Sequence, residues 1–337
     1  MNCFHFAFLC SRLRWLMPSL LLVASLPLAA QTCTEAQDMD AATRSAIEST
    51  AKSLLAMSAA GNVAGLRAQS IPSLAADFGG VEQAVSDNKD GLSGPATIRK
   101  TYLLELPGTA PVARAEFFCG VFGANGNTAN SAGFVLPNLA PGRYAVVIID
   151  INGAKGPYIL SEILQQTGGV WKLGGYYAKS GQVAGHDANW YVQKAQEFKQ
   201  KGQVHNAWFY FLEARDLTAP VPFMSTLKLD KLYEQAEQVK PSDMPTDGPV
   251  TTTLGTRTVK LLTAFPIVDN DQLALVVKYS SPDITNTGQT ALDNIALIKD
   301  LVTKYPEFRE GFSEVVMRAV PPSGPDYGTA LAMKEIK

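Results

Sequence analysis

Apolar residues recur at every third or fourth position in several stretches of the chain, which is the spacing of helices that bury one face. In the first of these stretches, 40–60, Ile47 and Leu54 share such a face, and Gly61 follows as a stop signal. The same spacing predicts further helices at 62–74, 81–89, 188–201, 204–217, 227–239 and 290–305.

From residue 96 the pattern changes to short runs of β-forming residues that are separated by turn residues such as Pro-Gly, Asn-Gly and Gly-Gly. The predicted strands are 98–106, 113–122, 132–139, 143–151, 158–166 and 170–179. Because helices come first and sequential strands follow, residues 40–180 are predicted to form one α+β domain.

Segment 186–219 has the spacing of two helices that pack closely against each other. Its small and aromatic packing positions are Ala195, Phe198, Gly202, Ala207, Phe211 and Ala214. This segment resembles a tetratricopeptide-type helical hairpin, and a generic helical hairpin of the same spacing is the alternative. With the helix that follows, it makes a unit at 186–239. Since repeat arrays need about three units to be stable and this chain has one, we expect the hairpin to pack on a neighbouring domain.

The last third of the chain predicts a small separate domain. Residues 240–250 are rich in Pro, Asp and Gly, which predicts a linker. Across 251–337 the order is strand, strand, helix, strand, strand, at 257–264, 273–279, 290–305, 313–320 and 329–336. We therefore expect a ββαββ domain with an antiparallel sheet. The predicted fold class is α+β: a helix-wrapped curved antiparallel sheet, a helical hairpin, then this domain.

The order of elements in 40–180 resembles the NTF2-like (SnoaL-like) family of cone-shaped α+β domains. Its local support is the turn Gly168-Gly169 followed by a strand that carries Trp171-Lys172. The resemblance implies a concave face with an apolar pocket. Four aromatic residues are candidates to line that pocket, or else belong to the core: Phe118, Tyr158, Trp171 and Tyr177.

A second resemblance competes for the same region. Residues 133–148 (GFVLPNLAPGRYAVVI) are similar to the Phe-x-x-x-Asn-Leu-x-Pro-Gly-x-Tyr element of carboxypeptidase-regulatory-like β-sandwiches. Such a sandwich has no place for the three helical segments that precede the strands. The cone is therefore preferred, and two facing sheets would favour the sandwich.

The N-terminal 30 residues have the pattern of a signal peptide. Arg12 and Arg14 precede the apolar run 15–28, and two alanines precede Gln31. The run is shorter than the roughly 18 residues of a membrane-spanning helix, although an uncleaved anchor is the alternative. We expect an exported chain, periplasmic or extracellular, with a mature N-terminal tail at 31–39 and no membrane span after cleavage.

Cleavage would leave two of the four cysteines, Cys33 and Cys119. In an oxidising compartment they could pair and join the N-terminal tail to a strand. The alternative is a buried, unpaired Cys119 and a Cys33 in a frayed tail.

Composition and charge indicate a folded globular protein and argue against nucleic-acid binding. Hydrophobic residues make up 46% of the chain and charged residues 18%, as in folded globular proteins. The net charge is −2, and the basic residues form no stripe interleaved with aromatics, so nucleic-acid binding is not expected.

Residue types that carry chemistry are sparse. Beyond the leader the histidines are His186 and His205, too few for a zinc or copper site without other ligands, and Asp187 is better explained as a helix N-cap. Asp269-Asn270 opens a hairpin turn rather than a calcium loop. No catalytic residues, metal site or cofactor are predicted.

These observations predict a non-catalytic binding or scaffolding protein of the cell envelope that acts through the helical hairpin or the sheet faces. Its partner would be a protein or another envelope component. The alternative is a small-molecule binding protein or enzyme that uses the pocket of the N-terminal cone. A third hypothesis is a β-sandwich carbohydrate or surface module.

Overall fold

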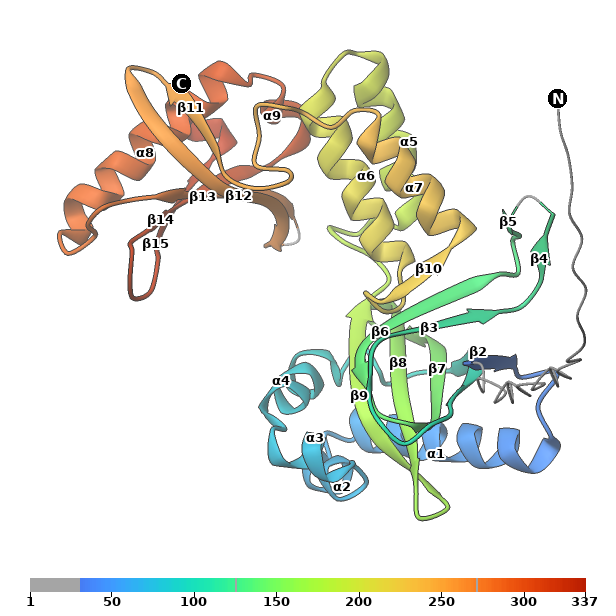
Figure 1. The fold of residues 1–337 in the computed structure, drawn as a ribbon. Coiled ribbons are helices and arrows are strands. Elements are labelled where there is room, and N and C mark those ends of the chain that lie inside the picture. The colour runs from blue at the N-terminus through green and yellow to red at the C-terminus, as the bar shows by residue number, and fades with distance from the viewer. Residues whose placement is uncertain (1–30, 125, 271) are drawn as a thin grey trace, which may run out of the picture.

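The computed structural model describes residues 31–124, 126–270 and 272–337, so the predicted signal peptide lies outside the described residues. The described part has the α+β fold class predicted from the sequence. Figure 1 shows an N-terminal sheet domain, a group of three helices beside it, and a C-terminal domain beyond those helices.

Four helices begin the N-terminal domain: α1 (Ala41–Ala59), α2 (Val63–Ala68), α3 (Pro72–Ala76) and α4 (Gly79–Asn88). The Asp40 side chain accepts a hydrogen bond from the Thr43 amide and caps α1, as short polar residues do at helix starts. One face of α1 is buried, through Ile47, Ala51 and Leu54, as its spacing predicts.

The main sheet of this domain has five antiparallel strands. Their spatial order is β1 (Thr32–Glu35), β2 (Ala96–Leu106), β7 (Gly142–Gly153), β8 (Gly156–Thr167) and β9 (Val170–Ser180). The helices cover one face of this sheet, where Leu54 and Phe78 pack against Val147, Ile149 and Leu160.

A second sheet covers the opposite face. It contains β3 (Val112–Cys119), β6 (Ala132–Leu139) and the short strand β10 (Met224–Thr226). Phe117 and Phe134 of this sheet pack against Tyr102 and Ile148 of the main sheet. The expectation of one curved sheet is therefore wrong, because the strands divide into two facing sheets. A two-strand arm, β4 (Phe122–Gly123) and β5 (Gly126–Asn127), extends from β3 and β6.

The element 133–148 contributes to both sheets. β6 belongs to the second sheet and β7 to the main sheet, so the turn at Pro141-Gly142 carries the chain from one sheet to the other. The Tyr144 hydroxyl donates to the Ala140 carbonyl at 2.7 Å and fixes this corner. The domain thus has the helices expected from one resemblance and the facing sheets expected from the other.

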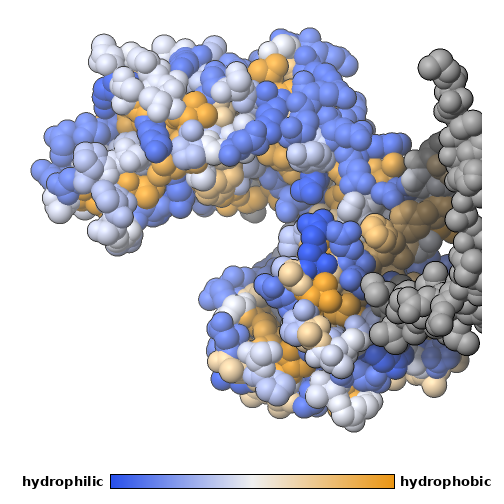
Figure 2. All heavy atoms as spheres, in the orientation of Figure 1, coloured by the Kyte–Doolittle hydropathy of each residue, from blue (hydrophilic) through white to orange (hydrophobic). Residues whose placement is uncertain are grey.

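The visible surface of the molecule is mainly hydrophilic. Figure 2 shows patches of apolar residues on both the N-terminal sheet domain and the C-terminal domain, among residues that are mostly polar. No helix among the described residues is long and apolar enough to cross a bilayer.

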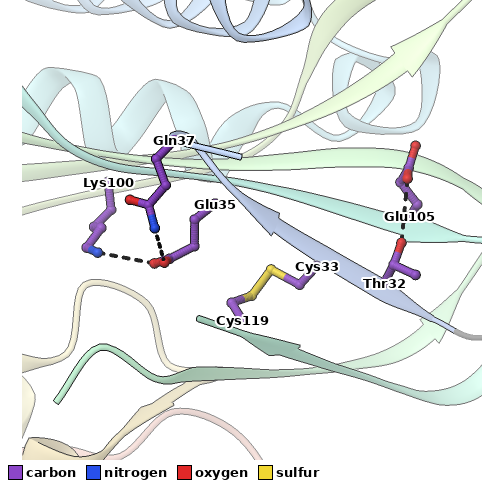
Figure 3. Close-up of a disulfide and its surroundings, with 7 residues drawn as sticks. All are labelled: Thr32, Cys33, Glu35, Gln37, Lys100, Glu105 and Cys119. Atoms are coloured by element: carbon purple, nitrogen blue, oxygen red, sulfur yellow. Dashed lines mark hydrogen bonds and ion pairs between the residues drawn. A yellow bond between two sulfur atoms is a disulfide. The ribbon is translucent and has the colours of Figure 1, made fainter. Parts of the chain in front are cut away.

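The two sheets are also joined covalently. Cys33 in β1 and Cys119 at the end of β3 form a disulfide, with their Cα atoms 5.0 Å apart (Figure 3). Beside it, the buried Glu35 carboxylate accepts hydrogen bonds from Lys100 and Gln37. The residues that the sequence placed in a tail therefore form an edge strand of the main sheet, held by β2 and by the disulfide.

Three helices follow: α5 (Ala188–Gln200), α6 (Val204–Thr218) and α7 (Leu227–Glu237). Asp187 caps α5 by accepting from the Trp190 amide, and Gly202 takes φ +74° in the turn, a conformation that favours glycine. Between α6 and α7 the chain enters the second sheet as β10, so this segment connects the helices to the N-terminal domain.

The C-terminal domain has the predicted ββαββ order with one added strand at its start. The strands are β11 (Val250–Leu254), β12 (Arg257–Asp269), β13 (Gln272–Ser280), β14 (Glu314–Val320) and β15 (Tyr327–Ala332), adjacent in that order. The helices α8 (Thr287–Lys304) and α9 (Phe308–Gly311) lie between β13 and β14 in sequence. β13 and β14 pair in parallel, so the expected all-antiparallel sheet is wrong. The segment with α8 and α9 supplies the long crossover connection that a parallel pair needs.

The helical hairpin and the C-terminal domain share one core. Phe198, Phe209 and Tyr210 of the hairpin are buried together with Phe308 and Phe312 of the C-terminal domain. The hairpin therefore packs on a neighbour, as expected for an isolated repeat unit. The predicted linker 240–250 is anchored in the same core by the fully buried Met244.

Candidate binding cleft

The structure does not bring the four predicted pocket residues together. Phe118 is 63% exposed on the outer surface of β3, and Tyr177 is 38% exposed against Phe223. Trp171 and Tyr158 lie on the helix-covered side of the main sheet. Side chains alternate along a strand, so the inward-pointing neighbours of Phe118 force its ring outward. The four residues therefore do not line one shared pocket, contrary to the prediction.

Apolar side chains of the domain pack between the helices and the main sheet. A buried acidic group in this core is Glu162 on β8, which is fully buried between Leu160 and Leu164. Among the described residues, neither of its carboxyl oxygens has a hydrogen-bond partner. Burial raises the pKa of the Glu162 carboxyl well above its usual range, because the low-dielectric surroundings disfavour the charged form.

Sequence reasoning missed Glu162. A glutamate at an inward-facing position of an apolar strand is the signal that was available, because residues at i and i+2 share a face. The Glu162 side chain is fully buried, so the geometry gives its carboxyl no access to a ligand.

A cleft of about 700 Å³ lies where the helices meet the N-terminal domain. One wall comes from β2 and β7 and from the loop before β6. The other wall comes from α5, the end of α6 and the segment β10–α7. β10 fixes this geometry because it is hydrogen-bonded to β6, while α7 continues directly from it.

The floor of the cleft is apolar. Its side chains come from both walls: Tyr102, Ile148, Val192, Met224, Leu227, Leu229 and Leu232. Thr226 caps α7 by accepting from the Leu229 amide, which sets the first turn of that helix against the floor. Ser131, Asn130 and Asn189 add hydrogen-bonding groups at the border.

The charged groups of the cleft are all cationic. Arg99 and Lys100 come from β2, while Lys228 and Lys231 come from the exposed side of α7. The lining side chains include no carboxylate, imidazole or thiol. An apolar floor with cations on both sides can hold the anionic group of a ligand while burying its apolar part.

The four cations differ in how far they are neutralised. Lys100 lies 3.2 Å from the Glu35 carboxylate, and Arg99 lies 3.5 Å from Asp150. Lys228 and Lys231 are exposed on α7 and form no ion pair among the described residues, and the carboxylate of Asp230 between them accepts from Ser225 and Asn127 instead. The two lysines are three residues apart on one helix, so both point to the same side. The α7 wall therefore supplies the uncompensated positive charge.

The histidines have structural neighbours. His205 lies between the carboxylates of Glu307 and Asp243, at 2.7 and 2.9 Å, and ties α6 to the C-terminal domain. The His186 ring stacks on Trp190 with ring centroids 3.7 Å apart. Within residues 31–124, 126–270 and 272–337 no group of three or more His, Cys, Asp or Glu side chains is arranged to hold a metal ion.

Comparison with protein-family models, curated proteins and solved structures finds no match for this chain. The interpretation of the cleft therefore rests on its own geometry and charge.

Proposed function

We propose that this chain is an exported, non-catalytic binding protein whose cleft holds an anionic amphipathic component of the cell envelope. The observation that carries the proposal is the combination of an apolar floor with four cations and no acid in the lining. The ligand has a hydrocarbon part and a phosphate or carboxylate group.

The size and polarity of the cleft support this ligand class. A volume of about 700 Å³ falls within the range of roughly 300–1,000 Å³ that is usual for small-molecule sites. Apolar burial contributes about 25 cal/mol for each Å² removed from water. The ammonium groups of Lys228 and Lys231 can form charge-assisted hydrogen bonds with an anionic headgroup.

Export is supported by two independent features. The first is the signal-peptide pattern of residues 1–30. The second is the Cys33–Cys119 disulfide, since disulfides persist mainly in oxidising compartments. An envelope location would also place the cleft near amphiphilic lipids.

The test compares three amphiphiles with the same hydrocarbon chain, each below its micelle concentration, by titration calorimetry on the chain from Gln31. The probes are dodecyl phosphate, the neutral dodecyl maltoside and the cationic dodecyltrimethylammonium. We expect dodecyl phosphate to bind at least tenfold more tightly than the other two, because only its headgroup can pair with the cations.

The charge requirement is tested with the double variant Lys228→Glu/Lys231→Glu and a matched control, Lys299→Glu, at an exposed position of α8. The double variant should lose dodecyl phosphate binding, and the control should bind like the parent. Equal affinity for all three amphiphiles, or unchanged binding by the double variant, would refute the proposal.

A further inference from the structure

One side of β12 has no partner over half of its length. β11 pairs with β12 only from Arg257 to Leu261, while β13 pairs with it as far as Asp269. Residues 263–269 therefore hydrogen-bond to a strand on one side alone within the described sheet. A free strand edge presents backbone N–H and C=O groups that can pair with another extended chain.

A groove of about 410 Å³ follows this free edge. Four consecutive residues of β12, 265–268, line it on one side. Since consecutive side chains of a strand point to opposite faces, a groove that touches all four runs along the edge and not over one face. Val183 and Leu212 form part of the opposite side.

The edge itself is apolar and extended. Phe265 is 39% exposed and Val268 is 46% exposed, while Pro266 stands between them. Proline is tolerated on an edge strand because its missing N–H can face the side without a partner. By alternation, the amides of Ala264 and Val268 then point to the same free side. The N–H and C=O of one residue point to the same side of an antiparallel strand. The free edge therefore offers two N–H donors, from Ala264 and Val268, and the carbonyl acceptors of Ala264, Pro266 and Val268.

The α6 side of the groove is acidic. Glu213 and Asp216 lie one turn apart on α6 and both line the groove. Lys179 compensates part of this charge, with its ammonium 3.5 Å from the Asp216 carboxylate. Burial, followed by the nearby Asp216, raises the pKa of Glu213 to about 7, so a cation placed beside it would favour its ionised form.

We infer that the free edge of β12 binds an extended basic peptide segment, which pairs with residues 263–269 as an added strand. A lysine or arginine side chain of that segment lies against Glu213 and Asp216. Main-chain hydrogen bonds supply affinity and the acidic wall supplies selectivity, as in other cases of strand addition. This site is separate from the cleft and does not depend on the function proposed for it.

The test uses two capped heptapeptides that differ only in charge, Thr-Val-Lys-Val-Lys-Val-Thr and its analogue with glutamate in place of lysine. Binding to the chain from Gln31 is followed by NMR, and amide hydrogen exchange is measured residue by residue. We expect the lysine peptide to bind at least tenfold more tightly and to slow exchange at Ala264 and Val268.

Two variants separate edge pairing from simple charge attraction. Glu213→Gln/Asp216→Asn should weaken the lysine peptide about threefold to tenfold, whereas Asp87→Asn on α4 should have no effect. Two N-methylated versions of the lysine peptide test the strand pairing, one methylated at the odd-numbered and one at the even-numbered residues. Methylation of the amides that face β12 should abolish binding, and methylation of the amides that face away should leave it unchanged. Equal binding of both peptides, no binding of either, or protection outside β12 would overturn the inference.

Discussion

The two sheet-containing domains of this chain bury their sheets in different ways. The main N-terminal sheet is covered on one face by helices and on the other by a second sheet, and a disulfide joins the two sheets. The C-terminal sheet instead shares a single core with α8 and the helical hairpin, and part of β12 has a free edge. The main sheet of the N-terminal domain is covered on both faces by that domain and β10. The core of the C-terminal domain, in contrast, is completed by side chains of the helical hairpin.

This difference bears on the location of the proposed binding cleft. Both faces of the main sheet in the N-terminal domain are covered by apolar side chains, and the binding cleft that we propose lies at the border of this domain with the helices. The three helices, whose hairpin shares a core with the C-terminal domain, supply the second wall of the cleft together with β10. The comparison predicts two cooperative units, residues 31–180 with β10, and residues 186–337 without it.

The largest effect is expected from breaking the shared core. Phe308 is fully buried among aromatic residues of α6 and the C-terminal domain. Phe308→Ala should destabilise the second unit by about 3–5 kcal/mol. Hydrogen exchange should then accelerate in both 188–239 and 251–337 and stay unchanged in 41–180.

The control for this variant is Leu292→Ala, since Leu292 is 62% exposed on α8. It should change the unfolding free energy by less than about 0.5 kcal/mol. If Phe308→Ala loosened the C-terminal domain and left the hairpin protected, the two would not form one unit.

The second-largest effect is expected from removing the disulfide, which should destabilise the N-terminal unit. Its cysteines are 86 residues apart in sequence, so breaking the link frees a long loop in the unfolded chain. Cys33→Ala/Cys119→Ala should destabilise the N-terminal unit by about 2–4 kcal/mol. Denaturant unfolding followed by exchange should show no change in the C-terminal unit, and equal loss in both would contradict the division.

Glu162 provides a substitution that should stabilise the N-terminal unit. Its buried carboxyl has no partner among the described residues, so Glu162→Leu should raise the unfolding free energy by about 1–3 kcal/mol. The control Glu48→Leu lies on α1, outside the buried core. Urea unfolding at neutral pH measures the difference, and a loss of stability in Glu162→Leu would indicate a partner for the carboxyl.

The same residue predicts a pH dependence. Because the folded state raises the pKa of Glu162, it binds more protons than the unfolded state above pH 4.5, the ordinary value for glutamate. Its contribution to stability is full below that value and is lost as pH rises toward the folded pKa. Glu162→Gln should remove this decline, so parent and variant should converge in acid and diverge at neutral pH. Parallel pH curves would contradict the burial of this group.

The smallest effect is expected at a helix cap. Asp187 accepts from the Trp190 amide at 2.9 Å and begins the hairpin. Asp187→Ala should cost about 1 kcal/mol, and only in the second unit. Asp187→Asn, which keeps an acceptor, should restore most of it. Thermal unfolding monitored by tryptophan fluorescence and exchange distinguishes this from a change in the N-terminal unit.

Local patterns predicted most helices and strands because a buried face imposes a period on the sequence. The cap residues Asp187 and Gly202 were predictable for the same reason, since capping chemistry is local. The short strands β1, β10 and β11 were missed, because three to five residues are too few to establish a period.

What the sequence could not provide is the arrangement of distant segments. Nothing in the local pattern of 113–151 assigns β6 and β7 to different sheets. The cations of the cleft come from Arg99-Lys100 and from Lys228 and Lys231, and only the insertion of β10 beside β6 brings these segments together. The parallel pairing of β13 and β14 was missed for the same reason, since a helix between two strands allows either orientation and only their placement in the sheet decides it.

The most direct test of the central claim is hydrogen exchange of the chain from Gln31 with and without dodecyl phosphate. A ligand that bridges the two units should slow exchange in β2 around Arg99 and Lys100 and in α7 around Lys228 to Leu232 at the same time. Protection on both walls, lost in Lys228→Glu/Lys231→Glu, is the result that the account predicts. Protection of one wall alone, or none at saturating ligand, would contradict it.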